Sequence, residues 1–534
     1  MDFNALKNDL KRELDQTVDC QNLLYRRGYL ISNRSDFSLQ EYPFYGNWSS
    51  VQINDFFYAY IHKDQHLYMR RKDGMTAVLI GHAYNPFTMQ YDENEILDRC
   101  LSAWQNSREQ FFSVINELAG IHVIGIFSEQ NALMVQDCIG MKSCYYSNLN
   151  GNIYITSHCS ILQDVDSPHV SEFVDQLIHT HAFRHWGSGY LPGDITVFDG
   201  LRRLGPNLCL ELRNGVYSVH RFFPLENHPV RQEEDHSTIK EIAALLQNSV
   251  SLCARKWDRP AVSLSGGTDS RTTLSSASQC YDKFKYYSFY CKEAELVDAQ
   301  AAHDICDTIG MPHTIYPIPA NNEDCAHFEL YKKIISHNSA YVSIPGDHEI
   351  RKYIFLSQLN DFDAELKSWV SEIGRVYWDR RFGFDLPAKF TPRDFTISQT
   401  RFLGPPRLMH QNDACYKDFL QRSGFVYPMY NYEHTDLFYW EYRFGAWGTL
   451  VTTGQDIFGF EVTMPMNCRK LIDMFLWYPR EFRKHDMVHK YVIAENEPKF
   501  GIINNEVRNN YFSNKRVLLE KLYYHYRMLF YRDK

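Results

Sequence analysis

The chain has 534 residues, a formal net charge of −9 and a hydrophobic content of 44%. This length predicts about two to four domains whose cores need no disulfides. The acidic charge argues against a protein that coats nucleic acid, because such domains usually have a pI above about 9. No run of about 18 apolar residues occurs, and the Met1-Asp2-Phe3-Asn4 start lacks signal-peptide features. We therefore expect neither a membrane span nor secretion.

The 13 cysteines predict reduced thiols rather than a disulfide framework. They run from Cys20 to Cys468, their number is odd, and neither a CxxC pair nor zinc-site spacing occurs. With no signal peptide, this usage predicts a cytoplasmic protein.

The N-terminal part of the chain has the pattern of a sheet-rich domain. Its first 50 or so residues give few signals beyond a charged helix at about 4–18. Short apolar runs between about 56 and 156 alternate with turns such as Asp73-Gly74 and Asn150-Gly151, which predicts strands and hairpins. A helical spacing over 94–118 interrupts them, and two further strands flank Asn214-Gly215. We place this domain at residues 1–225.

From residue 238 the chain alternates helices and strands. Helices are predicted at 239–254, 270–279 and 298–309, where Gly310 ends the last one, and strands at 261–264, 285–290 and 315–318. This alternation predicts a parallel sheet with helices on both faces. After about Cys325 the pattern is mostly helical. The second predicted domain covers residues 226–534.

The strongest chemical motif is Ser265-Gly266-Gly267-Thr268-Asp269-Ser270, which follows a predicted strand and opens a helix. The two glycines allow the backbone to approach an anion. The serine hydroxyls and the free N–H groups of the helix start can bind phosphate oxygens. Asp269 would help to hold Mg²⁺ against the phosphates. A plain glycine-rich turn is the alternative, and the Walker pattern GxxxxGK[ST] is absent.

This loop resembles that of the ATP pyrophosphatases, which cleave ATP between the α- and β-phosphates. Within that group, the chain resembles the asparagine synthetase family from about residue 76 to about 500. The segments that carry the resemblance include 79–85, 118–123, Gln136-Asp137-Cys138-Ile139-Gly140, 196–206 and Phe460-Glu461-Val462-Thr463. The resemblance implies an N-terminal layered α+β domain of the Ntn-hydrolase type. It also implies a C-terminal α/β PP-loop synthetase domain with a parallel sheet.

The resemblance implies further contacts to ATP and to Mg²⁺. Leu264 and Phe289 are expected beside the nucleotide. The family's second phosphate and metal loop, S-G-E-G-x-D-E, is matched best by Ser371-Glu372-Ile373-Gly374-Arg375. Glu372 is therefore expected to bind the metal together with Asp269, whereas Arg375 replaces the family's metal-binding aspartate. Either Glu372 takes over the metal, or Arg375 contacts phosphate or an anionic substrate directly.

Three residues late in the chain are candidates for catalysis. Lys490 resembles a lysine of the family. The resemblance implies that its charge neutralises pyrophosphate and the transition state of adenylate formation. Glu461 matches a glutamate that, in the β-lactam synthetase branch, pairs with a tyrosine to deprotonate an amine. Tyr442 and Tyr439 are the nearest candidates for that tyrosine.

We therefore expect an ATP-dependent amide-forming ligase. It would adenylate a carboxylate, release AMP and pyrophosphate, and transfer the acyl group to ammonia or a substrate amine. Free aspartate, a carboxylated sugar or surface glycan, and a peptide cyclised as by lasso-peptide cyclases remain alternative substrates. The acidic charge disfavours a tRNA-modifying enzyme, while Arg375 leaves open a catalytically impaired nucleotide-binding protein. We expect no nucleic-acid or membrane partner, and a homodimer is left open.

The resemblance also predicts that the N-terminal domain is no glutaminase. Working members use an N-terminal cysteine, whose own amine serves as the base. Here Asp2 follows Met1, and the first cysteine is Cys20. Residues 1–50 also give no sign of the family's first strand, so we expect this extension to cover or replace the glutamine pocket.

Overall fold

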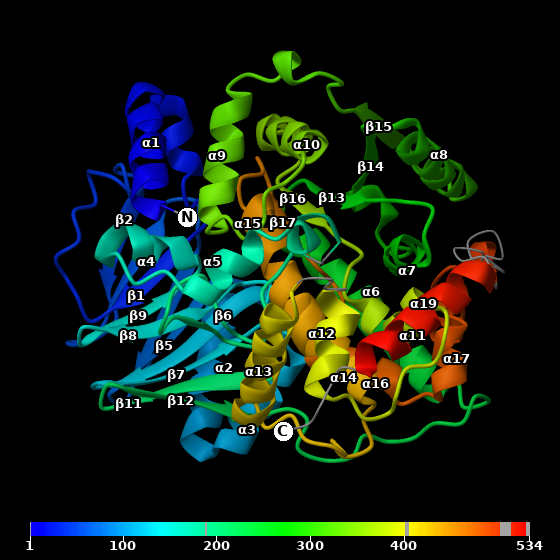
Figure 1. Ribbon diagram of the computed structural model, residues 1–534. Coiled ribbons are helices and arrows are strands. Elements are labelled where there is room, and N and C mark those ends of the chain that lie inside the picture. The colour runs from blue at the N-terminus through cyan, green and yellow to red at the C-terminus, as the bar shows by residue number, and fades with distance from the viewer. Residues whose placement is uncertain (1, 187–188, 401–404, 502–513, 530–534) are drawn as a thin grey trace.

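Three β-sheets organise the chain in the computed structural model, which describes residues 2–186, 189–400, 405–501 and 514–529 (Figure 1). Two six-stranded antiparallel sheets lie in the N-terminal half, and a five-stranded parallel sheet lies in the C-terminal half. The predicted mixed α/β class is confirmed. None of the described helices combines the length and hydropathy that a membrane crossing requires. All 13 cysteines are free thiols.

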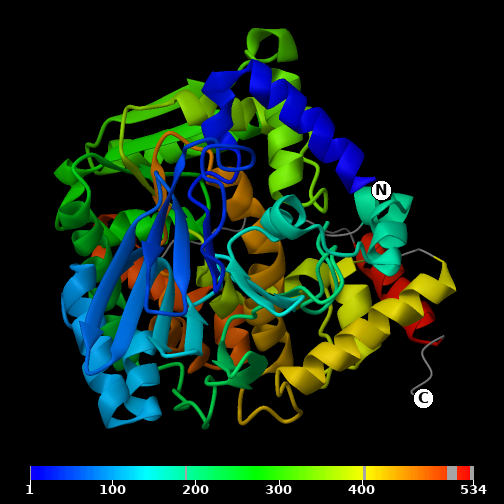
Figure 2. The ribbon, with the colours of Figure 1, turned by 90° about the vertical axis from the view of Figure 1, so that its left-hand side faces the viewer.

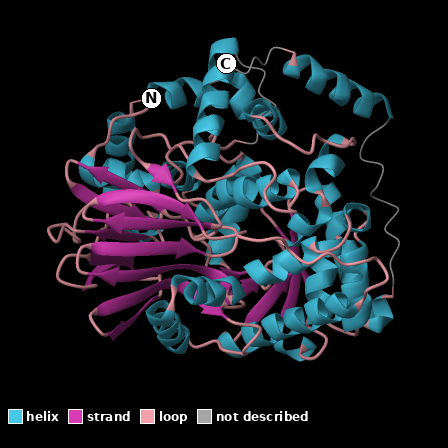
Figure 3. Cartoon of the chain, turned by 90° about the horizontal axis from the view of Figure 1, so that it is seen from below, coloured by secondary structure: helices cyan, strands magenta, loops and turns pink. Residues whose placement is uncertain are grey.

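The two antiparallel sheets pack face to face (Figure 3). The first has the order β10-β8-β9-β1-β3-β2 and the second β12-β11-β7-β6-β5-β4. Ile31 and Ile61 of the first sheet share one buried cluster with Ile80, Val123 and Leu210 of the second. In chain order the strands are β1 (Tyr29–Ser32), β2 (Trp48–Gln52), β3 (Tyr58–His62), β4 (Leu67–Lys72), β5 (Met75–Tyr84), β6 (Ala119–Ser128), β7 (Asn131–Gln136), β8 (Tyr145–Leu149), β9 (Asn152–Thr156), β10 (Arg202–Arg203), β11 (Leu208–Arg213) and β12 (Val216–Arg221).

Helices cover both outer faces of this sheet pair. α2 (Glu93–Asn106) and α3 (Arg108–Glu117) pack on the second sheet, while α1 (Phe3–Gln16) and α4 (Cys159–Asp166) lie over the first. The result is the layered α+β arrangement that the resemblance implied. One helix was expected over 94–118, but Ser107 has an extended backbone and caps the second helix by accepting from Gln110.

The first 50 residues contain a strand, although no strand was expected there. β1 (Tyr29–Ser32) lies inside the first sheet and pairs with β3 and β9. The expectation that this segment lacks a strand was therefore wrong. All four residues of β1 are buried, so the strand has no apolar–polar alternation by which a sequence could reveal it. The predicted charged helix is present as α1, which crosses one edge of the molecule (Figure 2).

The parallel sheet has the order β15-β14-β13-β16-β17. The strand predicted at 285–290 is β14 with the same bounds, and the predicted helices are present with ends shifted by up to five residues. β16 and β17 were missed because each has only three residues. The elements are α6 (Ser237–Lys256), β13 (Pro260–Ser263), α7 (Thr268–Ser276), η3 (Tyr281–Lys283), β14 (Lys285–Tyr290), α8 (Glu293–Thr308), β15 (His313–Pro317), β16 (Ala364–Leu366) and β17 (Glu461–Thr463).

The rest of the described chain after residue 325 is mostly helical, as predicted. Its helices are α9 (Phe328–Asn338), α10 (Asp347–Gln358), η5 (Ser371–Arg375), α11 (Tyr377–Phe382), α12 (Pro392–Thr400), α13 (Pro406–Arg422), α14 (His434–Phe438), η6 (Tyr439–Gly448), α15 (Thr449–Gln455), α16 (Arg469–Leu476), α17 (Arg480–Lys484), α18 (Met487–Asn496), η7 (Pro498–Phe500) and α19 (Asn514–Met528). Short helices η1 (Val18–Leu23), α5 (Glu172–Ile178), η2 (Ala182–Trp186) and η4 (Asn322–Asp324) complete the set.

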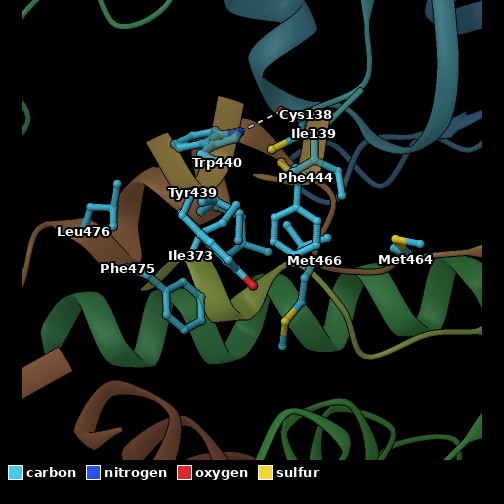
Figure 4. Close-up of a cluster of buried hydrophobic side chains, with 14 of the residues drawn as sticks. Cys138, Ile139, Ile373, Tyr439, Trp440, Phe444, Met464, Met466, Phe475 and Leu476 are labelled. Carbon is cyan, nitrogen blue, oxygen red and sulfur yellow. Dashed lines mark hydrogen bonds between the residues drawn. The ribbon is translucent and has the colours of Figure 1, made fainter. Parts of the chain in front are cut away.

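The two halves share a hydrophobic core. Cys138 and Ile139, in the loop after β7, pack against Trp440 and Phe444 of η6 (Figure 4). The indole Nε1 of Trp440 donates to the carbonyl of Cys138 at 2.8 Å. Among the described residues no strand pairing crosses residue 225, which is consistent with a boundary there. The boundary itself stays a prediction.

Candidate active site

A cavity of about 780 Å³ opens at the carboxyl ends of the parallel strands. Ser263 of β13, Ser288 and Phe289 of β14, and Lys367 just after β16 all contribute to its wall. Ligand sites of open parallel sheets lie at this edge, where the strand order changes direction. The sequence placed the predicted site at the same edge.

The glycine-rich loop has the internal hydrogen bonds of a preformed anion site. The N–H of Ser265 donates to Ser270 Oγ at 3.1 Å, and the two serine Oγ atoms are 2.9 Å apart. The N–H of Gly267 contacts Ser265 Oγ at 3.3 Å, and Gly267 is the N-cap of α7. The first N–H groups of α7 therefore point to the loop, where they and the helix dipole favour an anion.

The structure places most of the predicted ATP-binding residues around this cavity. Six of the nine line it: Leu264, Ser265, Asp269, Ser270, Phe289 and Glu372. Gly266 and Gly267 belong to the loop but not to the described lining, and Arg375 lies outside that lining as well. Their predicted role in ATP binding stays a prediction.

Both oxygens of Asp269 are engaged by protein donors. Ser371 donates its hydroxyl to Oδ1, and Arg375 Nη1 donates to Oδ2 at 2.5 Å. Arg375 then binds both oxygens of Asp486, through Nε at 2.7 Å and Nη2 at 2.9 Å. The arginine is thus the centre of an ion-pair chain between the phosphate loop and the start of α18.

Glu372, the second predicted metal ligand, is held differently. It accepts a hydrogen bond from the hydroxyl of Tyr439. Burial raises the pKa of Glu372, and the nearby charge of Asp269 raises it further. Both effects favour a protonated carboxyl, which is a poor ligand for a hard cation.

These contacts do not suit a protein-held Mg²⁺ ion. Within the described ranges, no group of three or more His, Cys, Asp or Glu side chains has the arrangement of a metal site. Each oxygen of Asp269 already accepts a hydrogen bond, and Arg375 adds a positive charge where a cation would bind. The residues present therefore do not fit the Mg²⁺ site that the resemblance implied.

The structure does not bring the three predicted catalytic residues into the cavity lining. Lys490 is half-buried on α18, which packs against α7, but its side chain is not part of the lining. Glu461 in β17 accepts from Trp257 Nε1 at 2.8 Å and contacts His66 at 3.0 Å. Tyr442 is buried and donates to the carbonyl of Leu191. The expected cluster of these three with the loop differs from this arrangement. Glu461 is the first residue of β17, so it lies at the amino end of the parallel sheet, whereas the cavity lies at the carboxyl ends.

Several lining residues escaped the sequence analysis. Lys352 of α10 faces the rings of Phe289 and Tyr353 at 5.6 and 5.5 Å, and burial lowers its pKa. No ion pair reaches Lys352 within the described part of the chain. Trp369 and Trp447 lie beside each other with ring centroids 5.4 Å apart. None of these residues belongs to a motif, so only their position in space identifies them.

A second, smaller cavity of about 40 Å³ lies between the two halves of the chain. Its wall includes Arg27, Lys142, Asp456 and Glu461. Lys142 Nζ donates to the carbonyl of Arg27 at 2.6 Å, and Arg27 Nη1 donates to the carbonyl of Asp456 at 2.6 Å. Gln455 lines both cavities, so the small one adjoins the large one through this side chain.

Comparison with known proteins agrees with this geometry in one region. Residues 241–361 match the family model described as asparagine synthase. Among curated proteins, Asparagine synthetase [glutamine-hydrolyzing] 1 of Bacillus subtilis (strain 168) is 23% identical over 216 residues. That match covers 40% of this chain and 32% of the relative, about a third of the relative's length.

Two solved structures show a more distant likeness. The glutamine phosphoribosylpyrophosphate amidotransferase from B. subtilis complexed with ADP and GMP is 10% identical, with a TM-score of 0.22. A structure described as the allosteric regulatory enzyme of purine biosynthesis is 9% identical, with a TM-score of 0.24. Each match covers 56% of this chain and 61% of the other. Residues 241–361, which contain the phosphate loop, are thus similar to asparagine synthetases, and this likeness supports an asparagine synthetase-like family for that part of the chain.

Proposed function

We propose that this protein is an ATP-dependent ligase that activates a carboxylate as an acyl-adenylate and joins it to an amine. The observation that carries the proposal is the Ser265–Ser270 loop, which follows β13, opens α7 and faces a cavity of about 780 Å³. A preformed anion loop at the carboxyl edge of a parallel sheet suits a polyphosphate.

In the proposed reaction a carboxylate oxygen of the substrate attacks the α-phosphorus of ATP. The bond to the bridging oxygen breaks, pyrophosphate leaves, and an amine then displaces AMP from the acyl carbon. The chain's part is to hold the departing phosphates at Ser265, Ser270 and the N–H groups of α7. Holding both substrates in one cavity supplies most of the acceleration that positioning can give.

Other residues of the cavity wall support a polar, ring-bearing acid as the substrate. Trp369 and Trp447 offer adjoining indole surfaces, and Lys352 offers a cation without an ion pair in the described structure. The buried Ser368 Oγ and Gln455 Oε1 lack hydrogen-bond partners among the described residues. Unpaired buried polar atoms are costly, so a hydroxyl-rich ligand would satisfy them. A carboxylated sugar matches this wall better than free aspartate does.

The N-terminal domain is proposed to act as a scaffold without glutaminase activity. β1, the candidate for the family's first strand, begins at Tyr29 and is preceded by α1 and η1. Cys20 is 3% exposed, and burial raises the pKa of its thiol, which lowers its nucleophilicity. Arg27 and Lys142 contribute to the wall of the small cavity at the domain boundary. Ammonia or a substrate amine would then supply the nitrogen, in a cytoplasmic protein as the cysteine usage suggests.

The decisive experiment uses a carboxylate labelled with ¹⁸O. Purified protein is incubated with ATP, hydroxylamine as the amine, and a panel that contains aspartate, a uronic acid and a peptide acid. Adenylation predicts pyrophosphate release and transfer of one ¹⁸O atom to AMP. Formation of ADP and phosphate would contradict the proposal. ATP binding without pyrophosphate under any condition would favour the impaired nucleotide-binding alternative, and activity with the peptide alone would favour a cyclase.

A further inference from the structure

A cation from another element, Arg375 of η5, lies against the phosphate loop. Asp269 lies in the first turn of α7 and lines the cavity, so its charge would oppose a bound polyphosphate. Arg375 meets it from η5, with Nη1 2.5 Å from Oδ2. The side chain of Arg375 is only 14% exposed and that of Asp269 20% exposed. Screening by water is therefore limited, and the pair interacts more strongly than a surface ion pair.

The same arginine is fixed from its other side. Its Nε and Nη2 form two parallel hydrogen bonds to Asp486, at 2.7 and 2.9 Å. Asp486 in turn accepts from Arg380 Nη1 at 2.5 Å. Two carboxylates and two guanidinium groups thus form a charge-neutral chain. The bidentate geometry holds the plane of Arg375 so that Nη1 remains directed at Asp269.

This chain of ion pairs competes directly with a metal ion for Asp269. Each oxygen of Asp269 already accepts one of these bonds, so a cation would either bind a remaining lone pair beside the positive charge of Arg375 or displace the Ser371 hydroxyl or Arg375 Nη1. Displacement of Nη1 would leave a buried guanidinium with one carboxylate partner beside a divalent ion. Removing one partner of a buried ion pair is strongly unfavourable.

We infer that Arg375 is a positioning residue that takes the place of a protein-held metal ion at the phosphate loop. It neutralises Asp269, so the protein binds a nucleoside triphosphate without a divalent cation on Asp269. Any divalent cation in the reaction would arrive with the triphosphate alone. The inference rests on the proposed function for the role of the loop, but its claim about metal binding can be tested without a nucleotide.

The first experiment measures Mn²⁺ binding to the nucleotide-free protein by electron paramagnetic resonance. Wild-type protein is expected to have no Mn²⁺ site that depends on Asp269. Arg375→Ser frees Asp269 and Asp486 beside Glu372 and is expected to create a site, which Asp269→Asn then removes from the double variant. Arg380→Ser is the matched control, because Arg380 pairs with Asp486 and not with Asp269. It is expected to create no site that depends on Asp269.

The second experiment measures ATP affinity by calorimetry in EDTA and in Mg²⁺. Wild-type affinity is expected to fall by less than about threefold in EDTA, whereas Arg375→Ser should lose at least about tenfold in EDTA and recover in Mg²⁺. Arg375→Lys keeps the charge and should restore most of the metal-independent binding. A purely structural role would weaken both conditions equally, and circular dichroism verifies that each variant is folded.

The results separate this inference from the proposed function. A wild-type Mn²⁺ site abolished by Asp269→Asn would overturn the inference while leaving the ligase proposal intact. A Mg²⁺ dependence of wild-type ATP binding that Asp269→Asn abolishes would also overturn it. If the wild type binds no ATP in either condition, the proposed function fails, and the Mn²⁺ experiment still decides the inference.

Discussion

The backbone N–H of Gly266 donates a hydrogen bond to Asp298 Oδ1 at 3.1 Å. Asp298 belongs to α8, the helix of the next strand–helix unit, so the phosphate loop is held from outside by a neighbouring helix. A Cβ at Gly266 would lie 2.9 Å from Ala301 Cβ and 3.1 Å from Asp298 Oδ1. This contact explains why position 266 is a glycine and why the facing residue of α8, Ala301, is small.

Gly266→Ala is expected to weaken ATP binding by about tenfold or more, because the loop must move away from α8 and lose the bond to Asp298. Calorimetric titration with ATP measures the loss. Gly266→Ala combined with Ala301→Gly removes the opposing methyl group and should recover much of the affinity. No recovery in the double variant would show that the contact with Ala301 is not the cause.

Incubation with glutamine is expected to produce no glutamate, with or without ATP. The reason is that Cys20 is buried in η1 and is not the first residue of a strand. Quantitative amino-acid analysis measures the product. Glutamate release that is lost in Cys20→Ala would contradict the scaffold role of the N-terminal domain.

Arg221→Met is expected to lower the apparent free energy of unfolding by about 3–5 kcal/mol. Arg221 on β12 binds both oxygens of Glu441 on η6, at 2.5 and 2.8 Å, and Glu441 is 1% exposed. The variant leaves a buried carboxylate without its cation at the junction of the two halves. Urea unfolding measures the change. Arg70→Met is the control, since its partner Asp98 is about half exposed and such a pair contributes at most about 1 kcal/mol.

Stability is expected to fall as the pH drops below about 6.5. Burial lowers the pKa of His122 to about 3, and its ring nitrogens have no partner among the described residues. The unfolded chain binds a proton near pH 6.5 while the folded chain does not, so protons favour unfolding between about pH 6.5 and 3. One such histidine costs about 2 kcal/mol between pH 7 and pH 5.

His122→Gln should therefore reduce the pH dependence by that amount. Urea unfolding at pH 7 and pH 5 gives the comparison. The exposed His485→Gln serves as the control and should leave the difference between the two pH values unchanged. An unaltered pH dependence in His122→Gln would show that this histidine is not the source.

Trp447→Ala is expected to raise the KM for the carboxylate substrate by about tenfold while ATP affinity stays within about twofold. Trp447 lies against Trp369, and Arg443 stacks on its ring at 4.2 Å from the centroid, so the indole is held in place. Initial-rate kinetics with the acid found by ¹⁸O transfer provide the test. Trp104→Phe on α2, outside the cavity lining, is the control. An equal loss of ATP affinity in Trp447→Ala would place the indoles at the nucleotide instead.

The sequence alone determined the elements that local patterns encode. The β14 strand and the helices α6, α7 and α8 follow from apolar periodicity, and the Ser265–Ser270 loop follows from residue types that are typical of an anion site. The strands and hairpins of the N-terminal half follow from turns such as Asn150-Gly151, whereas their layering was implied by the family resemblance. In each case the information lies within about ten neighbouring residues, where spacing in sequence corresponds to spacing in space.

Only the tertiary structure decided what surrounds the loop. Arg375 was identified as a departure from the family pattern, but its partners Asp269 and Asp486 lie 106 and 111 residues away in sequence. Lys352 and Trp447 reach the cavity from helices without a motif, whereas Glu461 and Tyr442 do not line it. The angle at which each helix packs depends on the whole core rather than on its own residues, so local pattern cannot predict which side chains meet.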